Sequence, residues 1–204
     1  MRDCGLSGRT RRRFIKTTVR DLKATSAGNV LDRAFDARQM NEKWVTDITY
    51  LPTQEGWVYL ASIMDLFSRR IVGYSMAEHM RVELVLEALK NAVALRRPGA
   101  GLLHHSDQGS QYTSYDYQKE LTLNRMVCSM SRKGECWDNS VAESFFGRLK
   151  EEVMPHGGWK SRQDAIDAVR EYIDAFYNSK RIQKRLGYIC PIEYELLEAA
   201  TAAA

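Results

Sequence analysis

Regular patterning in this sequence begins at Trp44-Val-Thr-Asp-Ile-Thr-Tyr-Leu51, a run of β-branched and aromatic residues that is typical of a strand. A second run of this kind covers residues 56–66, and the break at Pro52-Thr-Gln-Glu-Gly56 between the two predicts a hairpin. A third strand is expected over residues 70–76. Three short strands in succession predict an antiparallel meander.

The hydrophobic period then changes from that of a strand to that of a helix. Apolar residues at helical spacing predict a helix over residues 82–93, closed by Pro98-Gly99. A short strand is expected at 102–106, a helix at 114–123 and a further strand at 126–130. This alternation indicates a mixed α/β fold, in which a five-stranded sheet is flanked by helices.

Two longer helices are expected near the C-terminus. The first follows Asp138-Asn139, and the second opens at Ser161, which forms a capping-box pattern with Asp164. The apolar side of this last helix is expected to carry Ile166, Val169, Tyr172, Ile173 and Phe176.

Composition and charge limit the class of protein. The 204 residues are 44% hydrophobic and 27% charged, as in globular domains, and no window resembles a membrane span. The first residues carry charge but no apolar segment of a secretory signal, so we expect a cytoplasmic protein with no membrane partner.

The net charge of +4 hides a basic N-terminal arm. Residues 1–20 hold seven Arg and Lys residues, among them Arg11, Arg12 and Arg13, against one acid. Such an arm on a nearly neutral body indicates a polyanion partner, and a solvated, frayed terminus is the alternative.

The four cysteines, at positions 4, 128, 136 and 190, form no C-x-x-C pair and are expected to be reduced thiols. A zinc site built from Cys128, Cys136, His104 and His105 lacks a recognisable ligand spacing and is not favoured.

Three acids occur where functional groups tend to lie. Asp47 is inside the first strand, Asp107 ends the fourth strand, and Glu143 is on the helix after Asp138-Asn139. Each alone is more simply explained as a cap, a surface residue or an ion-pair partner. Together they can supply the carboxylate oxygens that hard divalent cations prefer, as a two-metal phosphoryl-transfer site requires.

The face of the helix that carries Glu143 has residues that suit contact with nucleic acid. Gly147 lies four residues on, and Lys150, seven residues on, points only about 20° away from Glu143. The glycine would leave room for a nucleic-acid backbone and the lysine would meet a phosphate. An exposed stripe with a salt-bridging lysine is the alternative.

Several motifs resemble one known family. They are Trp44 to Tyr50, Ile63-Met-Asp-Leu-Phe-Ser-Arg69, His105-Ser-Asp-Gln-Gly-Ser-Gln-Tyr-Thr-Ser114, Ser129 to Ser140 and Glu143-Ser-Phe-Phe-Gly-Arg-Leu-Lys150. In this order they resemble the retroviral-integrase-type core of bacterial insertion-sequence transposases, in particular the OrfB subunit of the insertion-sequence-three family. The 35 residues between Asp107 and Glu143 match the DD(35)E spacing, and residues 177–195 resemble the family's C-terminal pattern.

The resemblance implies a ribonuclease H-like fold whose first three strands are antiparallel. It also implies a DDE transposase that cleaves and transfers DNA strands, with Asp47, Asp107 and Glu143 as catalytic residues that bind Mg²⁺ or Mn²⁺, two ions in all. Lys150 is then the best candidate for a DNA contact, followed by Arg132 and Lys133.

Lesser roles are expected for the neighbouring polar residues. Asp65 is expected to be structural, Asp138 or Asn139 to cap the helix that follows, and His105 to pack or hydrogen-bond.

The resemblance also predicts the organisation of the chain. Residues 1–37 resemble the end of an upstream DNA-binding segment and its linker, residues 38–198 form the catalytic core with a C-terminal helical extension, and 199–204 form a tail. Because the upstream DNA-binding helices of the family are missing, specific recognition of the element ends is expected to need a further protein segment. The expected nucleic-acid partners are the ends of the insertion element and the target DNA. The expected protein partner is either further copies of this chain or a transposase subunit made from an upstream frame. When bound to DNA, the protein is expected at the nucleoid.

Two alternatives to an active enzyme core remain. One is a truncated, catalytically silent remnant or regulator that binds DNA or full-length transposase. The other is a ribonuclease H-type nuclease, which shares the fold and the metals but not these motifs, and which would cut RNA in a hybrid.

Overall fold

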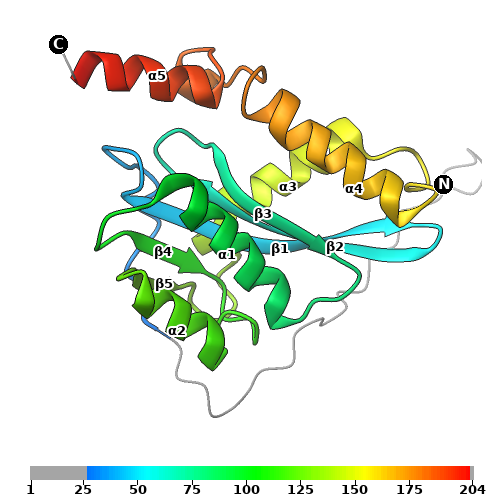
Figure 1. The fold of residues 1–204 in the computed structure, drawn as a ribbon, viewed down its shortest axis with the longest axis horizontal. Coiled ribbons are helices and arrows are strands. Elements are labelled where there is room, and N and C mark those ends of the chain that lie inside the picture. Colours follow the sequence, from blue (N-terminus) through cyan, green and yellow to red (C-terminus); the bar gives the residue numbers. More distant parts are fainter. Residues whose placement is uncertain (1–26, 203–204) are drawn as a thin grey trace, which may run out of the picture.

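A five-stranded mixed sheet forms the centre of the computed structural model, which describes residues 27–202 (Figure 1). Strands β1 (Lys43–Thr53), β2 (Gly56–Asp65) and β3 (Ile71–Ala77) form the predicted antiparallel meander. Strands β4 (Leu103–Ser106) and β5 (Val127–Met130) run parallel to β1. The spatial order β3-β2-β1-β4-β5 places β1 in the middle of the sheet.

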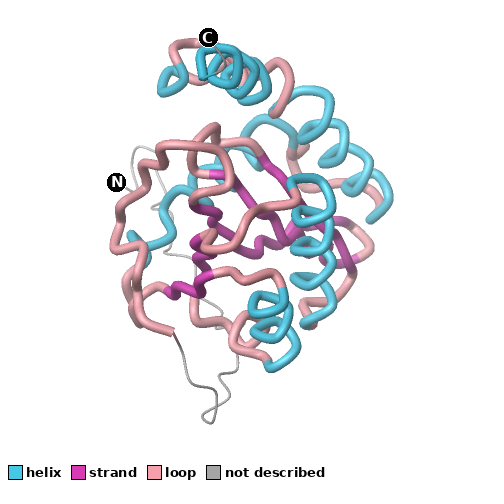
Figure 2. The backbone as a smooth tube through the Cα atoms, turned by 60° about the vertical axis from the view of Figure 1, so that its left-hand side comes forward, coloured by secondary structure: helices cyan, strands magenta, loops and turns pink. Residues whose placement is uncertain are grey.

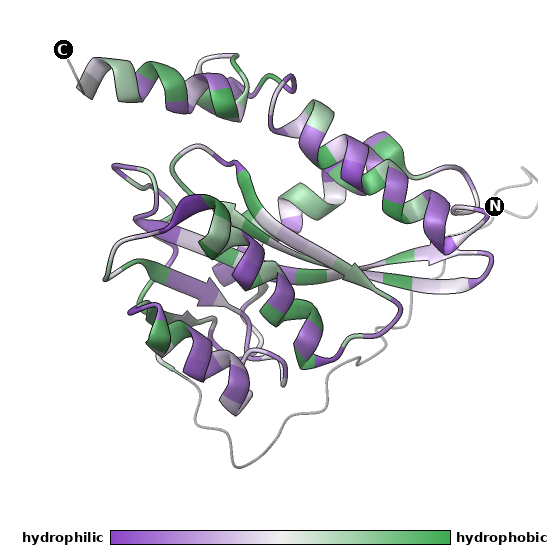
Figure 3. Cartoon of the chain, in the orientation of Figure 1, coloured by the Kyte–Doolittle hydropathy of each residue, from purple (hydrophilic) through white to green (hydrophobic). Residues whose placement is uncertain are grey.

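Helices cover both faces of this sheet (Figure 2). Helices α1 (Val82–Arg96) and α2 (Tyr115–Leu123) pack with Trp44 and Ile63 into one hydrophobic core. Helices α3 (Ser140–Val153) and α4 (Arg162–Glu171) pack with Val45 into the other. Hydrophobic and hydrophilic residues alternate along α1 and α2, as expected for helices with one buried side (Figure 3).

Local sequence signals explain how these elements begin and how closely they pack. Ser114 caps α2, and its hydroxyl accepts a hydrogen bond from the Tyr117 amide. The capping box predicted for Ser161 and Asp164 is present at α4. Gly73 lets α1 approach β3 closely, since a Cβ atom there would lie 2.4 Å from the Ala88 carbonyl oxygen.

The last long helix is shorter than the sequence predicted. It ends at Glu171 and continues as a π-helical turn over Tyr172–Tyr177. A π turn takes up one more residue than an α-helical turn, so the buried position moves from Phe176, which is 42% exposed, to Tyr177. The Tyr177 ring packs edge-on against Phe145 of α3, with centroids 4.9 Å apart.

The C-terminal helical extension expected up to residue 198 includes a further helix, α5 (Pro191–Ala202), which continues into the expected tail. It lies at the edge of the molecule (Figures 1 and 2), and a buried acid is one of its attachments to the core. The Glu195 carboxylate accepts hydrogen bonds from Ser68, Arg70 and Arg96. In the part of the chain that the structure describes, no helix has the length and apolar character needed to cross a membrane.

Candidate active site

Asp47 lies in the central strand, with its side chain in a crowded environment that retains some contact with solvent. Its Oδ1 accepts a hydrogen bond of 2.8 Å from the Ile48 amide. Burial raises the pKa of the Asp47 carboxyl well above its usual range, and the nearby carboxylates of Asp107 and Glu143 raise it further. Asp107 and Glu143 are therefore both close enough to act on Asp47.

Asp107 follows β4 directly and comes beside Asp47 through the register of the sheet. Strands β1 and β4 are paired in parallel from Lys43 with Leu103 to Val45 with His105, and this register, carried two residues further, sets Asp107 opposite Asp47. Asp107 Oδ1 accepts a hydrogen bond of 2.9 Å from the Gly109 amide, which fixes the carboxylate. Burial raises the pKa of Asp107.

Glu143 comes from α3, whose start is attached to β1. The Asn139 amide nitrogen donates to the Thr46 carbonyl oxygen at 3.2 Å, so the first turn of α3 lies next to Asp47. Glu143 is itself exposed, and partial burial raises the pKa of its carboxyl. It stands at the rim of the site, whereas the two aspartates lie deeper.

The acids do not form a closed ligand set in this conformation. Within residues 27–202, no three His, Cys, Asp or Glu side chains are placed so that they could hold a metal ion together. The donor atoms, all carboxylate oxygens, nevertheless match the preference of Mg²⁺ or Mn²⁺. A cation would also offset the repulsion that raises the pKa of Asp47.

Lys150 lies beside these acids, on the same helix as Glu143. Its ammonium group lowers the pKa of Asp47 and also lies over the Tyr50 ring, 4.7 Å from the centroid. Tyr50 meets Trp57 edge-on at 5.0 Å, and both rings are about half exposed. An exposed aromatic and basic surface thus adjoins the acid site.

The other candidate DNA contacts differ in position. Arg132 is bound to Asp138, to which it donates from its backbone amide, Nε and Nη2, and it also pairs with Asp32 at 3.1 Å. Lys133 is exposed. Arg11, Arg12 and Arg13 lie outside the described residues.

Asn139 is the N-cap residue of α3, one of the two residues expected there, but it does not cap the helix in the expected way. Its side chain makes no capping bond: the amide nitrogen donates to the Thr46 carbonyl oxygen, and the buried Oδ1 accepts no hydrogen bond from the described residues. The Asp138 carboxylate is fully buried and accepts hydrogen bonds from Asn29, Arg33 and Arg132, which hold the segment before β1 against the start of α3.

The two histidines have hydrogen-bonding roles. His105 contacts the hydroxyls of Ser129 and Ser131, and His104 contacts that of Tyr117. Burial lowers the pKa of His105 to about 4 and that of His104 to about 3, so both are neutral at pH 7. Asp65 is structural, as expected, and accepts hydrogen bonds from the Asn41 and Phe67 amides.

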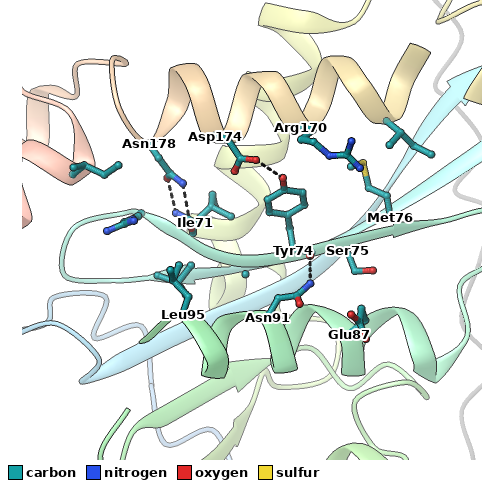
Figure 4. Close-up of a pocket in the computed structure, with 15 residues that line it drawn as sticks. Ile71, Tyr74, Ser75, Met76, Glu87, Asn91, Leu95, Arg170, Asp174 and Asn178 are labelled. Atoms are coloured by element: carbon teal, nitrogen blue, oxygen red, sulfur yellow. Dashed lines mark hydrogen bonds between the residues drawn. The ribbon is translucent and has the colours of Figure 1, made fainter. Parts of the chain in front are cut away.

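A cavity of about 640 Å³ lies apart from the acids, between β3, α1 and the C-terminal helices (Figure 4). Its polar groups are used for packing. The Asn178 amide exchanges two hydrogen bonds with the Ile71 backbone, and the Tyr74 hydroxyl donates to Asp174 at 2.7 Å. These hydrogen bonds, which lie along the cavity, fasten the edge strand β3 to the C-terminal segment.

Family comparison identifies two matched regions. Residues 37–136 match the integrase core domain, and residues 143–197 match a second integrase core domain family.

Curated relatives match most of the chain. An insertion element IS600 31 kDa protein of Shigella sonnei is 46% identical over 184 residues, which cover 90% of this chain and 68% of the relative. The transposase for IS904 of Lactococcus lactis is 41% identical, over 83% of this chain and 67% of the relative. Transposase InsF for IS3A of Escherichia coli is 38% identical, over 96% and 68%. The chain thus spans about two thirds of these relatives.

Solved structures of similar fold are retroviral integrases. The catalytic core domain of HTLV-2 integrase, determined with magnesium, has a TM-score of 0.59 at 15% identity, over 78% of this chain and 98% of that chain. A chain of the simian T-cell lymphotropic virus intasome has a TM-score of 0.60 at 16% identity, over 80% and 56%. At such identity the likeness shows the fold alone, which is the predicted ribonuclease H-like fold.

Proposed function

This chain belongs to the insertion-sequence transposases with an integrase core domain, as a DDE catalytic domain that mediates transposition, and on that premise we propose that Asp47, Asp107 and Glu143 are its catalytic acids. The observation that carries the proposal is the convergence of the three carboxylates. Asp47 and Asp107 come from neighbouring parallel strands, Glu143 comes from the helix fastened to β1, and both of the other acids raise the pKa of Asp47.

The three acids would hold Mg²⁺ or Mn²⁺, two ions in all. When bound, such ions activate the attacking oxygen and stabilise the leaving oxygen of a phosphodiester. Asp47 and Asp107 would supply ligands from the deeper part of the site, and Glu143 would supply a further ligand from the rim. Bound cations would favour the ionised form of these carboxyls, opposing the burial that raises their pKa values.

The reaction exchanges phosphodiester bonds without a covalent protein intermediate. In cleavage, a water oxygen attacks the phosphorus, the bond to the 3′ oxygen breaks, and a 3′ hydroxyl and a 5′ phosphate result. In strand transfer, that 3′ hydroxyl attacks a phosphorus of the target, the new bond forms, and the target's own 3′ oxygen leaves with a proton.

DNA contacts are proposed for Lys150 first, because it lies between the acids and the exposed ring of Tyr50. Lys133 and the arm with Arg11, Arg12 and Arg13 would add sequence-independent affinity. Arg132 contributes less directly, because its guanidinium is held by Asp138.

The wider setting is proposed from the family. The DNA partners are the element ends and the target, and the protein acts at the nucleoid in the cytoplasm. Assembly takes place with further copies or with a subunit from an upstream frame. The core extends from residue 38 to the C-terminal helices, after the arm and linker.

The test is metal-dependent joining of a DNA duplex that carries the ends of the flanking element to a second duplex. Wild type is compared with Glu143→Gln and with Glu151→Gln, which removes the same charge from an exposed position two turns further along α3. Joining that is lost in Glu143→Gln and kept in Glu151→Gln supports the assignment.

Equal activity in Glu143→Gln and wild type would remove Glu143 from the catalytic set. An inactive wild type that regains joining when the upstream region is supplied would locate the missing function in end binding. An inactive wild type under both conditions would favour the silent remnant. Cleavage of RNA in a hybrid without joining would favour a nuclease.

A further inference from the structure

A second cavity, of about 580 Å³, lies beside α3 and is lined by four basic side chains. Arg69 comes from the turn between β2 and β3, Arg148 from α3, and Lys184 and Arg185 from the segment before α5. We call it the arginine pocket. None of the described residues that line it is acidic; the others are Met64, Val141, Ser144, Phe145, Tyr177 and Gln183.

Arg69 is the unusual member of this group. Its side chain comes from a residue that is only 7% exposed, and its Nη2 donates to the Phe35 carbonyl oxygen at 3.2 Å. The buried Nη1 has no hydrogen-bond partner among residues 27–202. A buried guanidinium with an unused donor is costly unless an anion completes its hydrogen bonds.

Of the two acids near the pocket, one is paired with a basic side chain of the pocket itself, and the other is engaged elsewhere. Asp36 is bound to Arg185, and Asp65 accepts from two backbone amides and pairs with Arg96 at 3.6 Å. Burial and the neighbouring Arg185 lower the pKa of Arg69 to about 10 in spite of both acids. The positive charge at the base of the pocket is therefore not fully compensated by the described residues.

The pocket is separate from the acid site. The α3 residues that line it, Val141, Ser144, Phe145 and Arg148, are centred about 150° around the helix from Glu143, at 100° per residue. An anion in the pocket would lie across the width of a helix from the proposed scissile phosphate. It would anchor DNA without taking part in the chemistry.

We propose that the arginine pocket binds a backbone phosphate of a DNA segment that lies outside the acid site. This inference rests on the proposed function and adds a second DNA contact to it. A guanidinium presents paired donors that match the oxygens of a phosphate, and Arg69 Nη1 offers such a donor at the base of the pocket. Arg148, Lys184 and Arg185 are exposed at its mouth, and the volume exceeds that of an isolated phosphate, as a polynucleotide backbone requires.

The test measures duplex binding without divalent metal, so that it does not depend on catalysis by the acids. A labelled duplex of random sequence is titrated with the full chain at several salt concentrations. The double variant Arg148→Gln/Lys184→Gln removes two charges from the mouth of the pocket. Its matched control, Lys90→Gln/Lys119→Gln, removes two charges from exposed positions on α1 and α2.

The pocket variant is expected to bind the duplex about tenfold more weakly and to lower the slope of log K against log salt by about one. The control is expected to change affinity by less than about twofold. Arg69→Gln is expected to act like the pocket variant, and its thermal unfolding shows whether it is folded; if it is not, the double variant still decides.

Three results would overturn the proposal. Equal weakening by the pocket variant and the control would mean diffuse electrostatic attraction. If the wild-type protein bound no duplex, DNA could not be the ligand of the arginine pocket. The third result combines two observations. Millimolar inorganic phosphate stabilises wild type but not Arg69→Gln, relative to chloride of equal ionic strength. At the same time, Arg69→Gln and the double variant bind the duplex as tightly as wild type. That result would assign the pocket to a free anion.

Discussion

The Asn139 side chain fastens the helix that carries Glu143 to the strand that carries Asp47, because its amide donates to the Thr46 carbonyl oxygen at 3.2 Å. Both Asn139 and Thr46 are buried. Beyond Val45, the edge of β1 that faces β4 is no longer paired in the ladder, so this carbonyl is available to the amide. Glu143 follows one helical turn later, so this bond helps to set where Glu143 stands relative to the aspartates.

Asn139→Ala is expected to lower activity more than stability. It leaves the Thr46 carbonyl oxygen without this donor, which costs about 1–3 kcal/mol. A displaced Glu143 can cost up to about a hundredfold in rate. The measurements are thermal unfolding and the rate of DNA joining per folded molecule.

Asn178→Ala is the matched control for this variant. It also removes a buried amide that bonds to a strand, since Asn178 exchanges two hydrogen bonds with Ile71 of β3 (Figure 4). It is expected to destabilise the fold by a similar amount and to leave joining per folded molecule unchanged. An equal loss of rate in both variants would show that Asn139 acts through overall stability.

The sequence predicts what depends on short-range pattern. Strand-forming runs predicted the five strands, and the position of Asp107 at a strand end marked it as a candidate. The parallel pairing of β4 with β1 that brings it toward Asp47 is a finding of the structure. The family follows from relatives at 38–46% identity, and the fold is that of the solved integrase cores.

Features that break the usual patterns could not be predicted in this way. The π turn moves the buried side by one residue, from Phe176 to Tyr177, against a period of 3.6. Helix α5 is attached through buried Glu195 while Leu196 is 67% exposed, the reverse of an amphipathic signal. The sequence around Arg69 is typical of a surface turn, but segments distant in sequence cover this residue in the fold.

The burial of Asp47, together with the nearby carboxylates of Asp107 and Glu143, predicts that removing its charge stabilises the metal-free protein. The pKa of Asp47 is raised in the folded state above its ordinary value of 3.8, so the folded chain holds a proton that the unfolded chain has lost. Stability therefore falls as the pH rises from about 4 through the raised pKa.

Asp47→Asn removes this penalty. In EDTA at pH 7 to 8 it is expected to raise Tm by about 2–4 °C, the change that ~1 kcal/mol makes in a chain of this size. The gain is expected to vanish near pH 4. Magnesium is expected to raise the Tm of wild type and not of the variant. Asp116→Asn, an exposed change in α2, is the control and should not raise Tm. A lower Tm for Asp47→Asn in EDTA would contradict the argument.

Gly109 is expected to be required for the position of Asp107. A Cβ atom there would lie 2.9 Å from Asp107 Oδ1 and 3.1 Å from Gln111 Oε1, so the carboxylate has to move. Gly109→Ala should reduce joining about tenfold or more with little change in Tm, since small misplacements at a reacting centre are costly. Gly99→Ala, where a Cβ atom would meet nothing within 4 Å, should leave the rate unchanged.

Asp138 is expected to stabilise the fold in a pH-dependent way. Hydrogen bonds from Arg132 and then from Arg33 lower the pKa of its carboxyl below the usual range. Such a group contributes stability above its unfolded pKa of about 4 and loses it as the pH falls toward the folded value. Asp138→Asn should therefore cost about 2 kcal/mol at pH 7 in urea unfolding, and less at pH 3. A cost that is the same at both pH values would mean that packing dominates.

Lys150 is expected to act on DNA and on the acids at once, because its ammonium group lies over Tyr50 and lowers the pKa of Asp47. Lys150→Gln should weaken binding of element-end DNA and lower the salt slope by about one. Lys150→Arg keeps the charge and should retain most of the affinity.

The pH dependence of joining separates the two roles. Loss of the cation raises the pKa of Asp47, so joining by Lys150→Gln at saturating DNA should begin at a higher pH than in wild type. Weaker binding with an unchanged pH profile would restrict Lys150 to the DNA.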